Sequence, residues 1–89
     1  MKWFVYVLEN PNGMLYIGMT KDIVERIKRH NTRKHTFTAG KGPWKLVYSR
    51  SCGTRIEARA NEKYLKGGAG RTFLKMELAR MAKLADAHA

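Results

Sequence analysis

The first twenty residues contain two apolar segments that each carry a tyrosine, separated by the turn sequence Asn10-Pro11-Asn12-Gly13. Asparagine, proline and glycine together favour a tight chain reversal between strands. Alternation in the first segment directs successive side chains to opposite faces of a sheet. One face receives Trp3, Val5 and Val7, and the other receives Phe4, Tyr6 and Leu8. The chain is therefore predicted to begin with a β-hairpin, with Tyr6 on one strand and Tyr16 on the other.

A helix is predicted over residues 21–34. Asp22 is a suitable cap, and Glu25 follows three residues later, as in a capping box. The apolar residues Ile23, Val24 and Ile27 are expected to form the buried stripe of this helix. Residues 32–42 are polar, basic and without periodicity, which predicts a loop that could close over a ligand.

The second half of the chain predicts one more strand and two more helices. The strand covers residues 44–49 and is followed by a turn at 51–53. A capping pattern at Thr54 to Glu57 begins a helix that runs to residue 66, and the glycines of 67–70 break it. The last helix is expected over residues 72–85. The order β-β-α-β-α-α predicts an α+β fold, in which a small three-stranded sheet is flanked by helices.

The size and composition predict one small folded domain. The chain has 89 residues, of which 44% are hydrophobic, and such a chain has a compact core. The single cysteine, Cys52, excludes an intrachain disulfide partner and fits a reducing, cytoplasmic location. The apolar run near the start is too short to span a membrane, so it is interpreted as a strand and no membrane span is expected. The oligomeric state cannot be derived from these features.

The net charge is the most informative feature of the composition. Eighteen lysines and arginines against seven acidic residues give +11. An excess of this size favours a polyanionic partner, because phosphate contacts release bound counterions. We expect the partner to be nucleic acid, with DNA favoured and an anionic membrane surface as the weaker choice. The cations expected to contact it are Lys21, Arg29, Lys34, Lys41, Lys63 and Lys66.

Tyr6, Tyr16, Arg26 and His30 form a candidate catalytic group. A phenol can act as a base if its pKa is lowered or if water relays the proton. Arg26 and His30 are four residues apart, so they occupy one face of the predicted helix. Arginine there could hold a phosphate, and histidine could orient water or donate a proton. The alternative is that the tyrosines pack in the core while Arg26 and His30 lie on a solvated helix face.

Two carboxylates on the second predicted helix have different expected roles. Glu57 occupies the position of a capping-box acceptor, whereas Glu62 has no capping role. Glu62 is therefore the better candidate to bind one hard divalent ion, Mg²⁺ or Mn²⁺, completed by water and phosphate oxygens. The alternative for Glu62 is an ion pair with Lys66 at i,i+4.

These residues together resemble the GIY-YIG nuclease family, in particular its small stand-alone bacterial members. Val5-Tyr6-Val7 is a loose form of the first motif, and Tyr16-Ile17-Gly18 is an intact second motif. Residues 22–31 resemble the family helix that bears the arginine, and residues 57–66 resemble the helix that bears the metal-binding glutamate. The resemblance covers residues 1–75, leaving 76–89 as an accessory helix or tail. Met19 and Leu74 stand where some relatives have a lysine and an asparagine.

The resemblance implies hydrolysis of phosphodiester bonds with one divalent metal ion. Tyr6 or Tyr16 would activate the attacking water, Arg26 would hold the scissile phosphate, and His30 would assist. Glu62 would bind the metal, and Gly18 would allow close approach of the backbone to the site. We expect a DNA endonuclease, with branched or damaged DNA as the candidate substrate. The alternatives are a basic nucleic-acid-binding module with a weak or vestigial site, and an RNA-binding domain.

Overall fold

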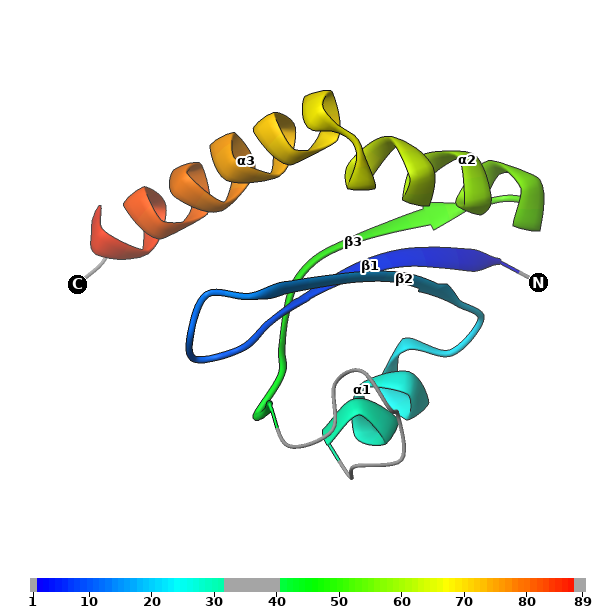
Figure 1. Cartoon of the computed structure of the whole chain (residues 1–89), viewed down its shortest axis with the longest axis horizontal. Coiled ribbons are helices and arrows are strands. Elements are labelled where there is room, and N and C mark those ends of the chain that lie inside the picture. The colour runs from blue at the N-terminus through cyan, green and yellow to red at the C-terminus, as the bar shows by residue number, and fades with distance from the viewer. Residues whose placement is uncertain (1, 32–40, 88–89) are drawn as a thin grey trace.

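The computed structural model describes residues 2–31 and 41–87, with side chains up to Arg80. The elements are β1 (Trp3–Glu9), β2 (Leu15–Thr20), α1 (Ile23–Asn31), β3 (Lys45–Cys52), α2 (Arg55–Lys66) and α3 (Gly68–Ala87) (Figure 1). The predicted α+β class and the predicted element order are both confirmed. In the described part of the chain, no helix has the length and apolar character needed to cross a membrane.

The sheet is antiparallel, with the strand order β2-β1-β3. The predicted hairpin of β1 and β2 is present, and its turn is organised by the buried Asn10. The Asn10 side-chain oxygen accepts hydrogen bonds from the backbone N–H groups of Asn12 (3.1 Å) and Met14 (2.8 Å). Gly13 adopts a φ of 82°, which favours glycine. This turn fixes the register, so that Tyr6 pairs with Gly18 and Leu8 pairs with Tyr16.

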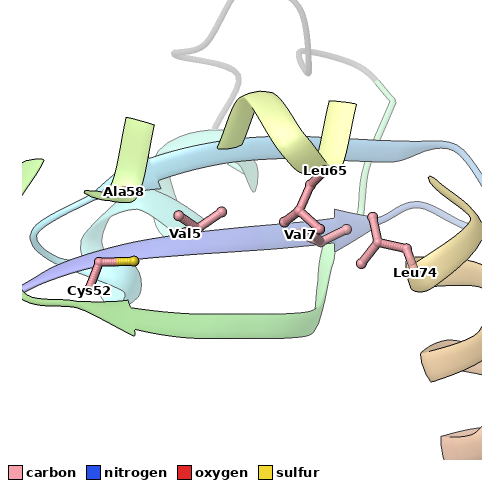
Figure 2. Packing of buried hydrophobic residues seen from close by; sticks show 6 residues of the cluster. All are labelled: Val5, Val7, Cys52, Ala58, Leu65 and Leu74. Carbon is pink, nitrogen blue, oxygen red and sulfur yellow. The ribbon is translucent and has the colours of Figure 1, made fainter. Parts of the chain in front are cut away.

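The two faces of the sheet are covered by different helices. α2 and α3 lie on one face and α1 lies on the other (Figure 1). The cluster on the α2 and α3 side contains Val5, Val7, Cys52, Ala58, Leu65 and Leu74 (Figure 2). Tyr6, Leu8 and Trp44 form the second cluster, with Tyr16 and Ile27 packed against it. The predicted alternation along β1 is thus confirmed: Val5 and Val7 face one layer, and Tyr6 and Leu8 face the other.

Both predicted helix caps are present. The Glu25 backbone N–H donates to Asp22 Oδ1 at 3.1 Å, and the Glu57 backbone N–H donates to Thr54 Oγ1 at 3.1 Å. Glu57 completes its part of the motif differently from an ordinary capping box, because its Oε2 accepts from the Gly53 backbone N–H at 3.1 Å. Glu57 therefore has the structural role expected of it.

Several predicted boundaries were wrong. β3 continues through Ser51 and Cys52, where a turn was expected, because these residues pair with Phe4 and Trp3 of β1. α3 begins at Gly68 rather than at residue 72, so the glycine segment belongs largely to a helix; only Gly67 separates α2 from α3.

α1 also differs from the prediction. It begins at Ile23 rather than at residue 21, and residues 32–34 of the predicted helix lie outside the described residues. Val24 is 66% exposed and does not join the buried stripe. Most of the predicted loop, residues 32–40, lies outside the described residues.

Candidate active site

The position of the Tyr6 ring depends on the glycine opposite to it. Tyr6 and Gly18 are register partners on β1 and β2. A Cβ atom at position 18 would lie 2.6 Å from the Tyr6 hydroxyl oxygen and 2.8 Å from Cζ. The absence of a side chain at Gly18 therefore lets the Tyr6 ring lie across β2, which is an edge strand of the sheet. Gly18 is close to the site as expected, and the group that approaches its backbone is the side chain of Tyr6.

His30 reaches the same place from α1. Its side chain is buried (1% exposed), and Nε2 lies 2.9 Å from the hydroxyl oxygen of Tyr6, within hydrogen-bond distance. The next residue holds this end of α1 in place. The Asn31 side chain accepts from the Trp44 backbone N–H (2.7 Å) and donates to the Trp44 carbonyl (3.2 Å). The structure therefore does not place His30 on a solvated helix face.

Tyr16 completes an aromatic group with Tyr6 and His30. The centroid of the Tyr16 ring is 4.6 Å from that of His30 and 6.3 Å from that of Tyr6. Trp44 packs edge-on against Tyr16 at 6.4 Å. Tyr6 is fully buried, whereas Tyr16 is only half-buried. Of the two phenols, Tyr16 is thus the one more accessible to a substrate.

Arg26 and Glu62 lie close enough to influence both phenols. Burial raises the pKa of Tyr6 and of Tyr16 above that of free tyrosine. The Arg26 guanidinium lowers the pKa of each phenol, and the Glu62 carboxylate raises it. Both phenols therefore keep their protons at neutral pH, and charge next to them controls how readily they lose those protons.

The Arg26 guanidinium has an unusual environment. Its Nε is buried and has no hydrogen-bond partner among the described residues. A buried guanidinium N–H is costly to leave without an acceptor, because desolvation is not compensated. The geometry is suited to an anion that supplies acceptor oxygens, as a phosphate does.

Glu62 could hold one metal ion but could not do so with a set of protein ligands. Its side chain is only 16% exposed, and its Oε2 lies 3.7 Å from Lys66 Nζ. The ion pair with Lys66, weighed as an alternative, is thus present. Among the described residues, no group of three or more His, Cys, Asp or Glu side chains could bind a metal ion. One carboxylate fits a hard ion such as Mg²⁺, which retains water and binds substrate phosphate.

Comparison with known proteins identifies the family of the chain. The family model for the GIY-YIG catalytic domain matches residues 2–74 of the chain. The chain belongs to the GIY-YIG family. As a GIY-YIG domain it is a member of a nuclease family, and the resemblance inferred from its motifs is confirmed.

The most similar relatives include other small bacterial proteins. The chain is 38% identical over 66 residues to a UPF0213 protein of Desulfotalea psychrophila, covering 72% of this chain and 60% of that one. It is 39% identical over 64 residues to a UPF0213 protein of Clostridium perfringens, covering 71% and 69%. The solution NMR structure of a UPF0213 protein from Bacillus halodurans is 34% identical, with a TM-score of 0.53 over 85% of this chain and 82% of that one. The chain thus spans less than two thirds of the Desulfotalea relative's length.

The expected nucleic-acid-binding cations of this GIY-YIG domain are not all equivalent. Lys41 and Lys63 are exposed. Lys21 Nζ lies 5.2 Å from the centroid of the Trp3 ring, and Arg29 pairs with Glu25 at 3.3 Å. Lys66 pairs with Glu62, which places it next to the candidate site. Lys34 lies outside the described residues.

Two residues of the site were missed in the sequence. Trp44 was assigned only to a strand. It lies one residue before β3, and its ring packs against Tyr16. Asn31 was assigned only to a helix, yet it ties α1 to Trp44. An asparagine directly after a candidate catalytic histidine was the available signal. Leu74, near the place where some relatives are expected to have an asparagine, is fully buried in the cluster on the α2 and α3 side.

Proposed function

We propose that this GIY-YIG domain is an endonuclease that hydrolyses DNA phosphodiester bonds with one divalent metal ion, Mg²⁺ or Mn²⁺. The observation that most supports the proposal is the buried Arg26 Nε without a partner, close to two phenols and a carboxylate. A phosphodiester would provide the anionic oxygens that suit this guanidinium. The net charge of +11 favours such a polyanion.

In this proposal Arg26 holds the scissile phosphate and stabilises the negative charge that develops on its oxygens. Tyr16 is the better candidate for the base because it is half-buried, whereas Tyr6 is sealed inside the domain. The Tyr6 hydroxyl oxygen and His30 Nε2 are 2.9 Å apart, so the two side chains hold each other in place. The His30 ring also packs against the ring of Tyr16. His30 is itself buried, so it assists by orienting the rings of Tyr6 and Tyr16.

Glu62 would hold the divalent ion, with water and phosphate oxygens as the remaining ligands. When bound, the ion supplies positive charge that offsets the carboxylate beside the phenols, lowers the pKa of bound water and stabilises the phosphate. Glu62 must release Lys66 to do this. Lys66 Nζ is 3.7 Å from the Glu62 carboxylate and the Lys66 side chain is 56% exposed, so the ammonium can move into water when the metal ion binds.

The test is cleavage of labelled branched, flapped and plain duplex DNA with Mg²⁺ or Mn²⁺, comparing wild type with Glu62→Gln. We expect cleavage to fall more than about a hundredfold, a barrier increase of about 2.7 kcal/mol. DNA binding should persist, because the basic surface is unchanged. Glu57→Gln is the matched control: its amide oxygen can still accept from Gly53, and cleavage should remain.

The second candidate function is a nucleic-acid-binding module without turnover. Two observations favour it: burial raises the pKa of both phenols, which keeps them protonated, and Lys66 is paired with the Glu62 carboxylate. Binding without metal-dependent cleavage across the whole DNA panel would establish this function and refute the nuclease. A preference for RNA at matched salt would instead indicate the RNA-binding alternative.

A further inference from the structure

A groove of about 560 Å³ lies between the start of β2 and the junction of α2 with α3. Its floor is apolar and is formed by Leu15, Ile17 and the fully buried Leu74. Its exposed rim carries three cations, Lys66, Arg71 and Lys75. No acidic side chain among the described residues lines it. An apolar floor with a cationic rim is suited to a ligand with a flat apolar part and an anionic part.

The groove is continuous with the candidate active site through two residues. Tyr16 lines the groove and also stacks with His30. Lys66 lines the groove and also pairs with Glu62. A nucleotide in the groove would therefore lie beside Tyr16 and Lys66, at the β2 edge of the sheet that the groove shares with the candidate site.

The groove is a built feature of the fold. A Cβ at Gly70 would collide with the backbone of Tyr64 and Leu65, so only glycine allows the first turn of α3 to pack this closely on the end of α2. That packing fixes the position of the next residue, Arg71, the first of the two cations that α3 contributes to the groove. Because Arg71 and Lys75 are four residues apart, they lie on one face of the helix.

We propose that this groove binds the nucleotide next to the scissile phosphate, with its base out of the duplex stack and packed on the half-buried Leu15 and Ile17. Lys66, Arg71 and Lys75 contact its flanking phosphates. The proposal rests on the proposed nuclease function for the identity of the neighbouring phosphate. A base inside an intact duplex is covered by its neighbours, so only an unpaired or extruded base can reach an apolar floor.

The experiment measures binding separately from cleavage, in the Glu62→Gln background. The probe is a flapped DNA with a fluorescent adenine analogue beside the cleaved bond, or at successive junction positions if no bond is cleaved. The groove variant is Arg71→Ala with Lys75→Ala. The matched control is Arg50→Ala with Lys45→Ala, which removes the same charges from exposed positions on β3, at the opposite edge of the sheet.

We expect the emission of the analogue to rise on binding, because the base leaves the stack, and this rise to disappear in the groove variant but not in the control. The slope of log affinity against log salt should fall by about 1 to 2 in the groove variant. An abasic site at the same position should weaken binding at least about fivefold.

The possible failures are distinguishable. Wild-type cleavage with no change in emission and with equal binding by the groove and control variants would overturn the groove and leave the nuclease intact. No cleavage, but an emission rise that requires Arg71 and Lys75, would keep the groove as a nucleotide site and refute the hydrolysis. Unchanged DNA binding with lost binding to phosphatidylglycerol vesicles would overturn the proposal and assign the groove to a lipid surface.

Discussion

The two faces of the sheet differ in character, although the central strand β1 contributes side chains to both. The face under α2 and α3 is aliphatic, with Val5 and Val7 packed against Leu65 and Leu74 (Figure 2). The face under α1 is aromatic and polar, with Tyr6 beside Tyr16 and His30. The aliphatic face needs only good packing, whereas the aromatic face contains the buried imidazole of His30, the buried phenol of Tyr6, the half-buried phenol of Tyr16 and a guanidinium nitrogen without a described hydrogen-bond partner.

This difference shows how a small domain can combine stability with a site. Burying polar groups has a cost unless they are paired, and a chain of 89 residues has little stability to spare. Successive residues of β1 point to opposite faces, so the residues that form the aliphatic core alternate with residues that face the candidate site. Stability should therefore respond to substitutions on one face, and cleavage to substitutions on the other.

The largest separation is expected for Tyr16→Phe. If Tyr16 is the base, cleavage should fall about 10²–10⁴-fold, or about 3–5 kcal/mol in the barrier. The free energy of unfolding should change by no more than about 1 kcal/mol. Single-turnover cleavage and urea unfolding provide the two measurements.

Tyr48→Phe is the matched control for Tyr16→Phe, because Tyr48 is on β3 and packs against Phe73 of α3 at 5.8 Å. It should leave cleavage unchanged. If Tyr6→Phe reduced cleavage far more than Tyr16→Phe, the assignment of the base would pass to the buried phenol.

The reverse separation is expected for Leu65→Ala. This side chain is fully buried in the aliphatic cluster, and its truncation should lower the free energy of unfolding by about 2–5 kcal/mol. Cleavage by the folded protein should be unchanged. Ile56→Ala truncates a side chain of the same helix that is 82% exposed, and it should change stability by less than about 0.5 kcal/mol. Equal effects of the two variants in thermal unfolding would refute the assigned core.

Gly18→Ala should affect both properties, because the glycine supports the aromatic face. The new methyl group would meet the Tyr6 hydroxyl, and the ring would have to leave His30. We expect a loss of about 1–3 kcal/mol in stability, typical of overpacking, together with strongly reduced cleavage. Gly68→Ala, with open space around its Cβ, is the control. A fully active Gly18→Ala protein would show that the position of Tyr6 does not matter.

The sequence predicted local features well, because their causes are local. The hairpin turn at Asn10 to Gly13 and the caps at Asp22 and Thr54 depend on neighbouring residues. The errors have non-local causes. Cys52 is a strand residue because it pairs with Trp3, and Gly70 is helical because it packs on the α2 backbone.

The candidate site could be predicted only in part. Periodicity placed Arg26 and His30 on one face of a helix, but nothing in their spacing said that α1 and α2 lie on opposite faces of the sheet. The resemblance to the GIY-YIG family supplied the grouping with Glu62. The groove lined by Arg71 and Lys75 was missed, because it exists only once α3 packs against α2. The catalytic roles of these residues stay predictions.

The smallest effect concerns alkaline pH. Burial raises the pKa of Tyr6 and Tyr16 in the folded protein, so above about pH 10 the unfolded chain loses phenolic protons that the folded chain retains. The unfolded state then binds fewer protons, and stability falls as the pH rises, by up to about 1.4 kcal/mol per tyrosine per pH unit. Below about pH 10 this contribution is fully present. Urea unfolding at about pH 8 and about pH 11 should show a smaller decline for the Tyr6→Phe, Tyr16→Phe double variant than for wild type. Lysines deprotonate equally in both proteins, so an identical decline would show that the phenols are not buried together as the aromatic face requires.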